Sequence, residues 1–165
     1  MKSAGIERSV QQSLLDRLID LDPKTSTELP PSWTESVRQL KASLRHDLEW
    51  LLNTRRIPTL APESFEELTR SLYHFGLPDI TSMGRDSRDV RTKLMRQVEE
   101  TLAAFEPRLA GVRVSVVESD DDGKRQLRFL IEGLLRMEPN PEQVVFDTVL
   151  EFSSGEYHVK GDGRA

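Results

Sequence analysis

Carboxylates are the residues of this sequence best suited to chemistry, because the chain has no cysteine and only three histidines. Two of the acids adjoin aromatic residues: Glu49 precedes Trp50, and Glu106 follows Phe105. In a glycosidase, one member of a carboxyl pair must be buried among apolar groups to hold its proton. We interpret both acids instead as groups at the surface or at a junction between elements, which is the commoner role of such residues.

Other catalytic and ligand-binding patterns are missing from the sequence. No G-x-S-x-G motif is present, and no glycine-rich phosphate loop precedes a helix. The histidines His46, His74 and His158 are far apart and form no H-x-x-x-H pair. The sequence therefore predicts no catalytic residue, no metal site and no cofactor.

The arginine-rich stretch "RDSRDVRTKLMR", residues 85–96, raises the question of phosphate contacts. Asp86 and Asp89 dilute its positive charge, and the whole chain carries a net charge of −5. A nucleic-acid-binding surface is normally strongly basic. We interpret the stretch as the solvated face of a helix and expect no nucleic-acid partner.

Length and composition predict a soluble single domain spanning residues 1–165. No apolar run approaches the roughly 18 residues that cross a bilayer, and no signal peptide is evident, so we expect a protein that is not membrane-embedded. The lack of cysteine fits the reducing cytoplasm. Within the domain we expect a loosely attached helix and loop at 1–30, a core at 31–160 and a disordered tail at 161–165.

The first half of the sequence predicts four helices, because its apolar residues recur every three or four positions. A first helix carries an apolar stripe of Val10, Leu14, Leu15, Leu18 and Leu21, and a second spans 34–53. The third begins after Ser64, with Glu67 completing a capping box, presents Phe65, Leu68 and Leu72 as its apolar face, and ends at Gly76. The fourth runs from about 86 to 105.

From residue 110 the apolar period changes to two, which predicts strands. Val112, Val114 and Val116 mark the first strand, and "SDDDGKR" is typical of a hairpin turn. Two further strands follow, with a short fourth around Tyr157 and Val159. Their apolar faces comprise Leu127, Phe129 and Ile131 on the second, and Val144, Phe146, Leu150 and Phe152 on the third. The expected fold class is α+β, a mainly antiparallel sheet of three or four strands covered by helix 86–105.

The two tryptophans are candidates for the core or for contacts. Trp50 adjoins the leucine stripe of the second helix, so we expect it in the core. Trp33 follows a proline-rich loop, and both roles stay open for it.

The junction Glu106-Pro107-Arg108 lies where helical habit gives way to extended habit. Proline fixes φ and lacks an N–H group, so the helix must stop at a defined place. A carboxylate and a guanidinium are then held at a rigid corner, and arginine suits bidentate pairing with carboxylates. Two roles stay open: contact with a partner protein, or an internal staple between the helix end and the sheet.

Four segments taken in order resemble one known family. They are "SLLDRLID", "SLRHDLEWLLNTRR", "SLYHFGLPD" and "FEPRLAGVRV", at residues 13–20, 43–56, 71–79 and 105–114. This set resembles the TssE family of type VI secretion baseplate subunits, which belongs with the lysozyme-like wedge proteins of contractile phage tails. The resemblance covers about residues 10–118. Phe75 stands where a tyrosine is common in relatives.

The resemblance implies a structural subunit rather than an enzyme. It implies partners TssF, TssG and TssK in a baseplate wedge at the cytoplasmic face of an inner-membrane complex. It also implies a link to the first sheath ring of TssB/TssC, with Glu106, Pro107 and Arg108 contacting other baseplate components. We expect the sheath link at a sheet edge near 143–160. The alternatives are a peptidoglycan glycosidase and a protein-binding regulatory adaptor of the same fold.

Overall fold

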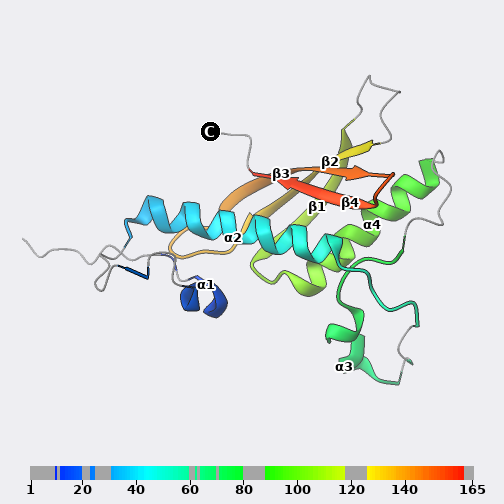
Figure 1. Cartoon of the computed structure of the whole chain (residues 1–165), viewed down its shortest axis with the longest axis horizontal. Helices are drawn as coiled ribbons and strands as arrows, with labels where there is room; N and C mark the ends of the chain where they lie inside the picture. Colours follow the sequence, from blue (N-terminus) through cyan, green and yellow to red (C-terminus); the bar gives the residue numbers. More distant parts are fainter. Residues whose placement is uncertain are drawn as a thin grey trace, which may run out of the picture. The chain divides into compact units, whose positions relative to one another are not determined.

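The computed structural model describes residues 10, 12–19, 23–24, 31–59, 62, 64–69, 71–79, 88–117 and 126–161. The chain divides into two compact units, Met1–Leu44 and Arg45–Ala165. Its elements (Figure 1) are α1 Leu14–Leu18, α2 Trp33–Asn53, α3 Glu66–Thr69, the 3-10 turn η1 Leu72–His74, α4 Arg88–Phe105, β1 Leu109–Val117, β2 Gln126–Leu135, β3 Glu142–Glu151 and β4 Glu156–Lys160. The predicted boundaries of the core, after residue 30 and after residue 160, stay a prediction.

The four strands form one antiparallel sheet in the order β1-β2-β3-β4. Alternate residues of the central strands are buried, as a two-residue period requires: Leu127, Phe129 and Ile131 on β2, and Val144, Phe146, Thr148 and Leu150 on β3. Phe152 lies beyond the end of β3, in the turn to β4. The α+β class and the short fourth strand are confirmed, whereas the predicted hairpin at 119–125 lies outside the described residues.

Helix α4 confirms the fourth helical prediction. Leu94, Val98 and Leu102 are buried on one face, and the helix packs against β1. Glu99 also contacts β1, because its Oε1 accepts a hydrogen bond of 2.7 Å from the backbone N–H of Val114. The helix and the strand that follows it in sequence therefore form one packed pair (Figure 1).

Helix α2 confirms the second helical prediction, but the position of Trp50 corrects another. Leu44, Leu48 and Leu51 are buried, whereas Trp50 is 63% exposed. Successive residues of a helix are about 100° apart, so Trp50 points away from the stripe that contains its neighbour Leu51. Trp33, at the start of α2, is half-buried.

The first and third predicted helices form only short turns. Within α1, Leu14, Leu15 and Leu18 are exposed, so the predicted apolar stripe is not a buried face. The third prediction divides into α3 and η1, and Phe65 and Leu72 are both exposed. Ser71 breaks this segment: its hydroxyl donates to the carbonyl of Leu68 and accepts from the N–H of Tyr73, which starts a new turn.

Gly76, predicted as a helix C-cap, instead permits a close approach between two backbone segments. The N–H of Leu77 donates to the carbonyl of Thr54 at 2.8 Å, and the N–H of Arg56 donates to the carbonyl of Leu77 at 2.8 Å. Gly76 has φ of +96°, and a Cβ there would lie 2.2 Å from the Thr54 oxygen. Only glycine fits this position.

Candidate functional site: a polar corner after helix α4

The residues between α4 and β1 form a tight corner. The N–H of Glu106 still bonds the carbonyl of Leu102 at 2.9 Å, and Pro107 then has no N–H to continue the helix. The N–H of Leu109 donates to the carbonyl of Glu106 at 3.1 Å, and β1 begins at that residue. The helix therefore becomes a strand within three residues, and all three of the predicted contact residues lie in this corner.

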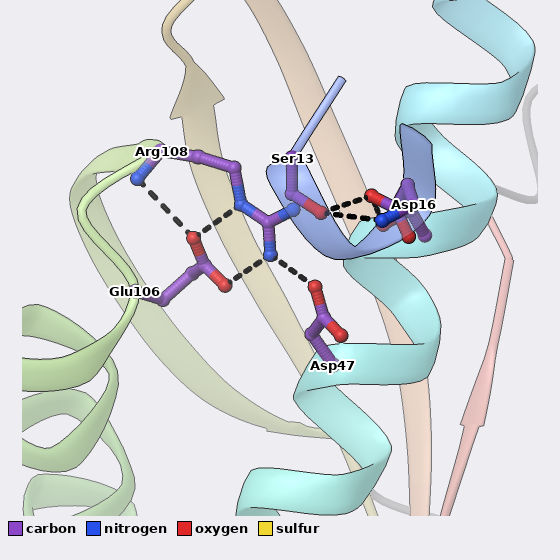
Figure 2. Close-up of polar contacts among 6 residues, drawn as sticks. Ser13, Asp16, Asp47, Glu106 and Arg108 are labelled. Carbon is purple, nitrogen blue, oxygen red and sulfur yellow. Dashed lines mark hydrogen bonds and ion pairs between the residues drawn. The ribbon is translucent and has the colours of Figure 1, made fainter. Parts of the chain in front are cut away.

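Arg108 is bonded to two carboxylates from different elements (Figure 2). Its Nε and Nη2 donate to the two oxygens of Glu106 at 2.7 and 2.6 Å, a bidentate pair. Nη2 also donates to Asp47 Oδ2 at 2.6 Å, and Asp47 lies on α2. An internal staple is therefore present, with the expected local pair to Glu106, but its long-range partner lies on α2 and not in the sheet.

Burial makes this ion-pair network a fixed part of the fold. Glu106 is only 5% exposed. Its hydrogen bond with Arg108 raises the pKa of the guanidinium further above its usual value, so the arginine stays charged. Pro107 is exposed, and the buried Nη1 of Arg108 makes no hydrogen bond within the described chain. The carboxylate of Glu106 is thus engaged internally, while contact of the corner with a partner stays a prediction.

An aromatic row adjoins the corner. The ring of Phe105 lies 5.3 Å from that of Phe75, and Phe75 lies 6.1 Å from Trp50, both in edge-to-face geometry. Phe75 and Phe105 are half-buried, and Trp50 is the exposed end of the row. A large exposed aromatic supported by two others is typical of a binding anchor. The position of Trp50 outside the leucine stripe of α2 is the sequence signal that could have identified it as an exposed anchor.

The two acids considered for glycosidase chemistry have ordinary structural roles. Both oxygens of Glu106 bind Arg108, and Glu49 Oε1 lies 3.8 Å from His158 Nδ1. The carboxylate of Glu106 is therefore engaged within the corner. Among the described residues, no three histidine, aspartate or glutamate side chains gather as a metal site would require.

Comparison with known proteins places the chain in a family. A sequence profile of the family described as "Baseplate wedge protein gp25" matches residues 38–140. No curated protein matches the chain. One solved structure, "The baseplate complex from the type VI secretion system", contains a similar chain, with a TM-score of 0.46 and 20% identity over 67% of this chain and 93% of that one.

A protein with this α+β fold and ion-paired corner thus belongs to the class of structural proteins that form assemblies. Because the profile spans more than half of the chain, the protein belongs to the baseplate wedge protein gp25 family. Membership makes it a component of a baseplate. No helix in the described ranges has both the length and the apolar character needed to cross a membrane.

Proposed function

We propose that the protein is a structural wedge subunit of a type VI secretion baseplate, without enzymatic activity. It binds TssF, TssG and TssK at the cytoplasmic face of the inner-membrane complex. Family membership supports the baseplate role, and the four TssE-like segments support the type VI assignment. The observation that carries the proposal is the rigid corner at Glu106, Pro107 and Arg108, with Trp50 exposed beside it.

The corner supplies the properties that a contact surface in an assembly needs. Its backbone is fixed by the Arg108 network, so little conformational entropy is lost when a partner binds. Pro107 and Trp50 are exposed, and the indole offers a large apolar area with few rotatable bonds. In this proposal the ion pairs hold the corner in place, and Pro107 and Trp50 make the contact.

The test is recovery of a wedge complex after co-expression with TssF and TssG. Trp50→Ala should keep the melting temperature and weaken binding at least tenfold, as expected for an aromatic anchor. Ile57→Ala is the matched control, because Ile57 is also an exposed apolar residue at 50% exposure. Normal binding by Trp50→Ala would remove this surface from the proposal. Failure of the wild-type chain to recover TssF and TssG would refute the baseplate function itself.

The predicted sheath edge near 143–160 is only partly covered, and its contact with the sheath stays a prediction. β3 pairs with β2 along its whole length, but with β4 only at residues 147–151. On β4, the side-chain amide of Asn53 exchanges two 2.8 Å hydrogen bonds with the N–H and carbonyl of Tyr157. Arg45 Nη1 donates to the carbonyl of Val159 at 3.4 Å. Side chains of α2 thus occupy three backbone groups of β4 that an added strand would use, while residues 143–146 of β3 lie outside the pairing with β4.

We propose that the sheath link uses the opposite edge, at β1. The N–H of Val114 points outward to Glu99, so Val116, two residues on, also directs its backbone groups away from β2. Val116 forms no outward hydrogen bond with any described residue. Free backbone groups on an edge can accept a strand from another protein. A strand of the first TssB/TssC ring is the proposed occupant.

Proline at Val116 tests this edge, since an outward-facing edge position is where a sheet tolerates proline. Val116→Pro should fold and unfold cooperatively but abolish the nucleation of sheath polymerisation by assembled baseplates. The control is Val112→Ala, which shortens a half-buried β1 side chain and keeps every N–H. Sheath growth at the wild-type rate on Val116→Pro baseplates would exclude β1 as the docking edge.

A further inference from the structure

The apolar side chains of α1 face solvent. Leu14, Leu15 and Leu18 are 75, 64 and 80% exposed, the C-cap residue Ile19 just after the helix is 54% exposed, and no residue of α1 is buried. The spacing of the three leucines, i, i+1 and i+4, places them on one face of the helix. A surface helix normally turns such a face towards its own core. In α1 this face is left uncovered by the described chain.

The polar face of α1 is the one that contacts α2. Asp16 accepts a 2.6 Å hydrogen bond from the hydroxyl of Ser43 and another from Ser13, the N-cap of α1 (Figure 2 shows the Ser13 bonds). Just before the helix, the N–H of Val10 donates to Ser36 Oγ, and the amides of Gln12 and Gln39 are hydrogen-bonded. Polar bonds therefore orient α1 with its apolar side outward.

This arrangement is costly for an isolated protein. A helix of five residues is well below the roughly 12–15 residues at which isolated helices become stable in water. At about 100 Å² of apolar surface for each large side chain, the four residues expose roughly 300 Å². A contiguous patch of about 300–600 Å² is the largest on a typical monomer and often marks a binding site. A partner that covers the patch would stabilise the helix as well.

The size and charge of the patch favour one kind of partner. A stable dimer buries about 800 Å² on each subunit, so a patch of this size is too small to hold two copies of the chain together. It fits the insertion of a single helical turn into an apolar groove, a common mode of recognition. Arg17 lies within the turn, is exposed, and its side chain forms no hydrogen bond or ion pair with any described residue. A groove with a carboxylate on its rim would complement this charge.

We propose that α1 is a docking motif for a second wedge protein. Leu14, Leu15, Leu18 and Ile19 enter an apolar groove on that protein, and Arg17 pairs with an acidic residue on the rim of the groove. This inference rests on the proposed baseplate function, because it names a further contact within the same assembly. The residues that make this contact differ from those of the corner and from those of the β1 edge.

The experiment measures binding of the full-length chain to the purified TssF–TssG complex. Leu14→Glu with Leu18→Glu should reduce affinity at least tenfold, and Arg17→Glu should reduce it by a smaller factor and with a stronger dependence on salt. Ile57→Glu with Phe65→Glu is the matched control, since it introduces the same two charges at other exposed apolar residues. Circular dichroism and melting temperature should be unchanged in all of these variants.

Each result decides the proposal. Wild-type affinity in the Leu14→Glu, Leu18→Glu variant would overturn the inference and leave the baseplate function intact. A wild-type chain that does not bind TssF–TssG at all would overturn both. A large drop in melting temperature for the variant would show that the face is buried in the free chain, and a dimer in sedimentation that the variant loses would assign the face to a second copy. Either finding would overturn the proposal that α1 docks into a groove on a second wedge protein.

Discussion

Helices α1 and α4 have the same kind of sequence pattern and opposite surroundings. Both carry apolar residues at helical spacing, and both were predicted as amphipathic helices. In α4, Leu94, Val98 and Leu102 are 4, 0 and 0% exposed, whereas Leu14 and Leu18 of α1 are 75 and 80% exposed. The pattern predicts that residues share a face, but it does not decide what covers that face.

Whether the apolar face of each helix is buried depends on the segments that the helix contacts. α4 continues through the three-residue corner into β1, and this short connection returns the chain onto the apolar face of the helix. α1 is linked to α2 through Asp16 and Ser43, so its polar side is directed inward. A short connection to an apolar neighbour buries a stripe, and a polar attachment leaves it free for another molecule.

The largest expected contrast is in hydrogen exchange. The amides of α1 have only single-turn bonds, such as Arg17 N–H to Ser13 O at 3.1 Å, with no buried side chain to protect them. The amides of α4 open with the core, whose unfolding costs about 5–15 kcal/mol in a typical domain. We expect exchange in α1 to be faster by roughly a thousandfold or more, measured on the isolated chain by mass spectrometry. Comparable protection of the amides in the two helices would contradict the difference in burial between α1 and α4.

The next largest contrast is between two leucine truncations. Leu102→Ala removes a side chain with 0% exposure and should lower the free energy of unfolding by about 2–5 kcal/mol. Leu18→Ala is the matched substitution at 80% exposure and should change it by less than about 0.5 kcal/mol. Urea denaturation of both variants provides the measurement. A loss above about 1 kcal/mol for Leu18→Ala would mean that α1 packs on its apolar side in solution.

The sequence predicted those features that depend on neighbouring residues along the chain. The two long helices, the strands and their buried alternation follow from periodicity, and Pro107 alone sets the end of α4. The partner of Arg108 could not be predicted in the same way. Asp47 is 61 residues away and has no local signature, so only the packing of α2 brings it to the corner. The two hydrogen bonds between Asn53 and Tyr157 of β4 depend on the same packing.

An intermediate effect is expected at the corner itself. Arg108→Ala leaves the buried carboxylate of Glu106 without its cation, and a lost charge-assisted hydrogen bond of this kind costs about 1–3 kcal/mol. The side chain of Arg108 is 24% exposed, so solvent screening keeps the loss below the value for a fully buried pair. Thermal denaturation of Arg108→Ala, and of Arg128→Ala as a control at a solvent-exposed ion pair, measures the difference.

Binding to TssF–TssG separates the two roles of Arg108. If the arginine acts only as a staple, Arg108→Ala lowers the melting temperature and weakens binding only through the loosened corner, at a temperature where the variant is folded. Weaker binding in the folded variant, with stability like that of the wild type, would show that the guanidinium contacts the partner directly. Glu106→Gln separates the contribution of charge from that of side-chain shape, because it removes the charge pair and keeps a side chain of nearly the same shape.

The smallest expected effect is at the polar attachment of α1. Ser43→Ala removes the hydrogen bond from Ser43 to Asp16 without changing the sequence of α1. Alanine has the higher helix propensity, so α2 and the melting temperature should be unaffected or slightly stabilised, while α1 loses a bond worth about 1 kcal/mol. Trypsin cleavage after the exposed Arg17 should then accelerate about fivefold, since proteolysis follows the population of the opened state. Thr34→Ala raises the propensity of α2 in the same way without touching this bond, and it should leave cleavage unchanged. Equal cleavage rates for Ser43→Ala and the wild type would show that the Asp16 bond does not hold α1, and the outward orientation of its leucines would then need another cause.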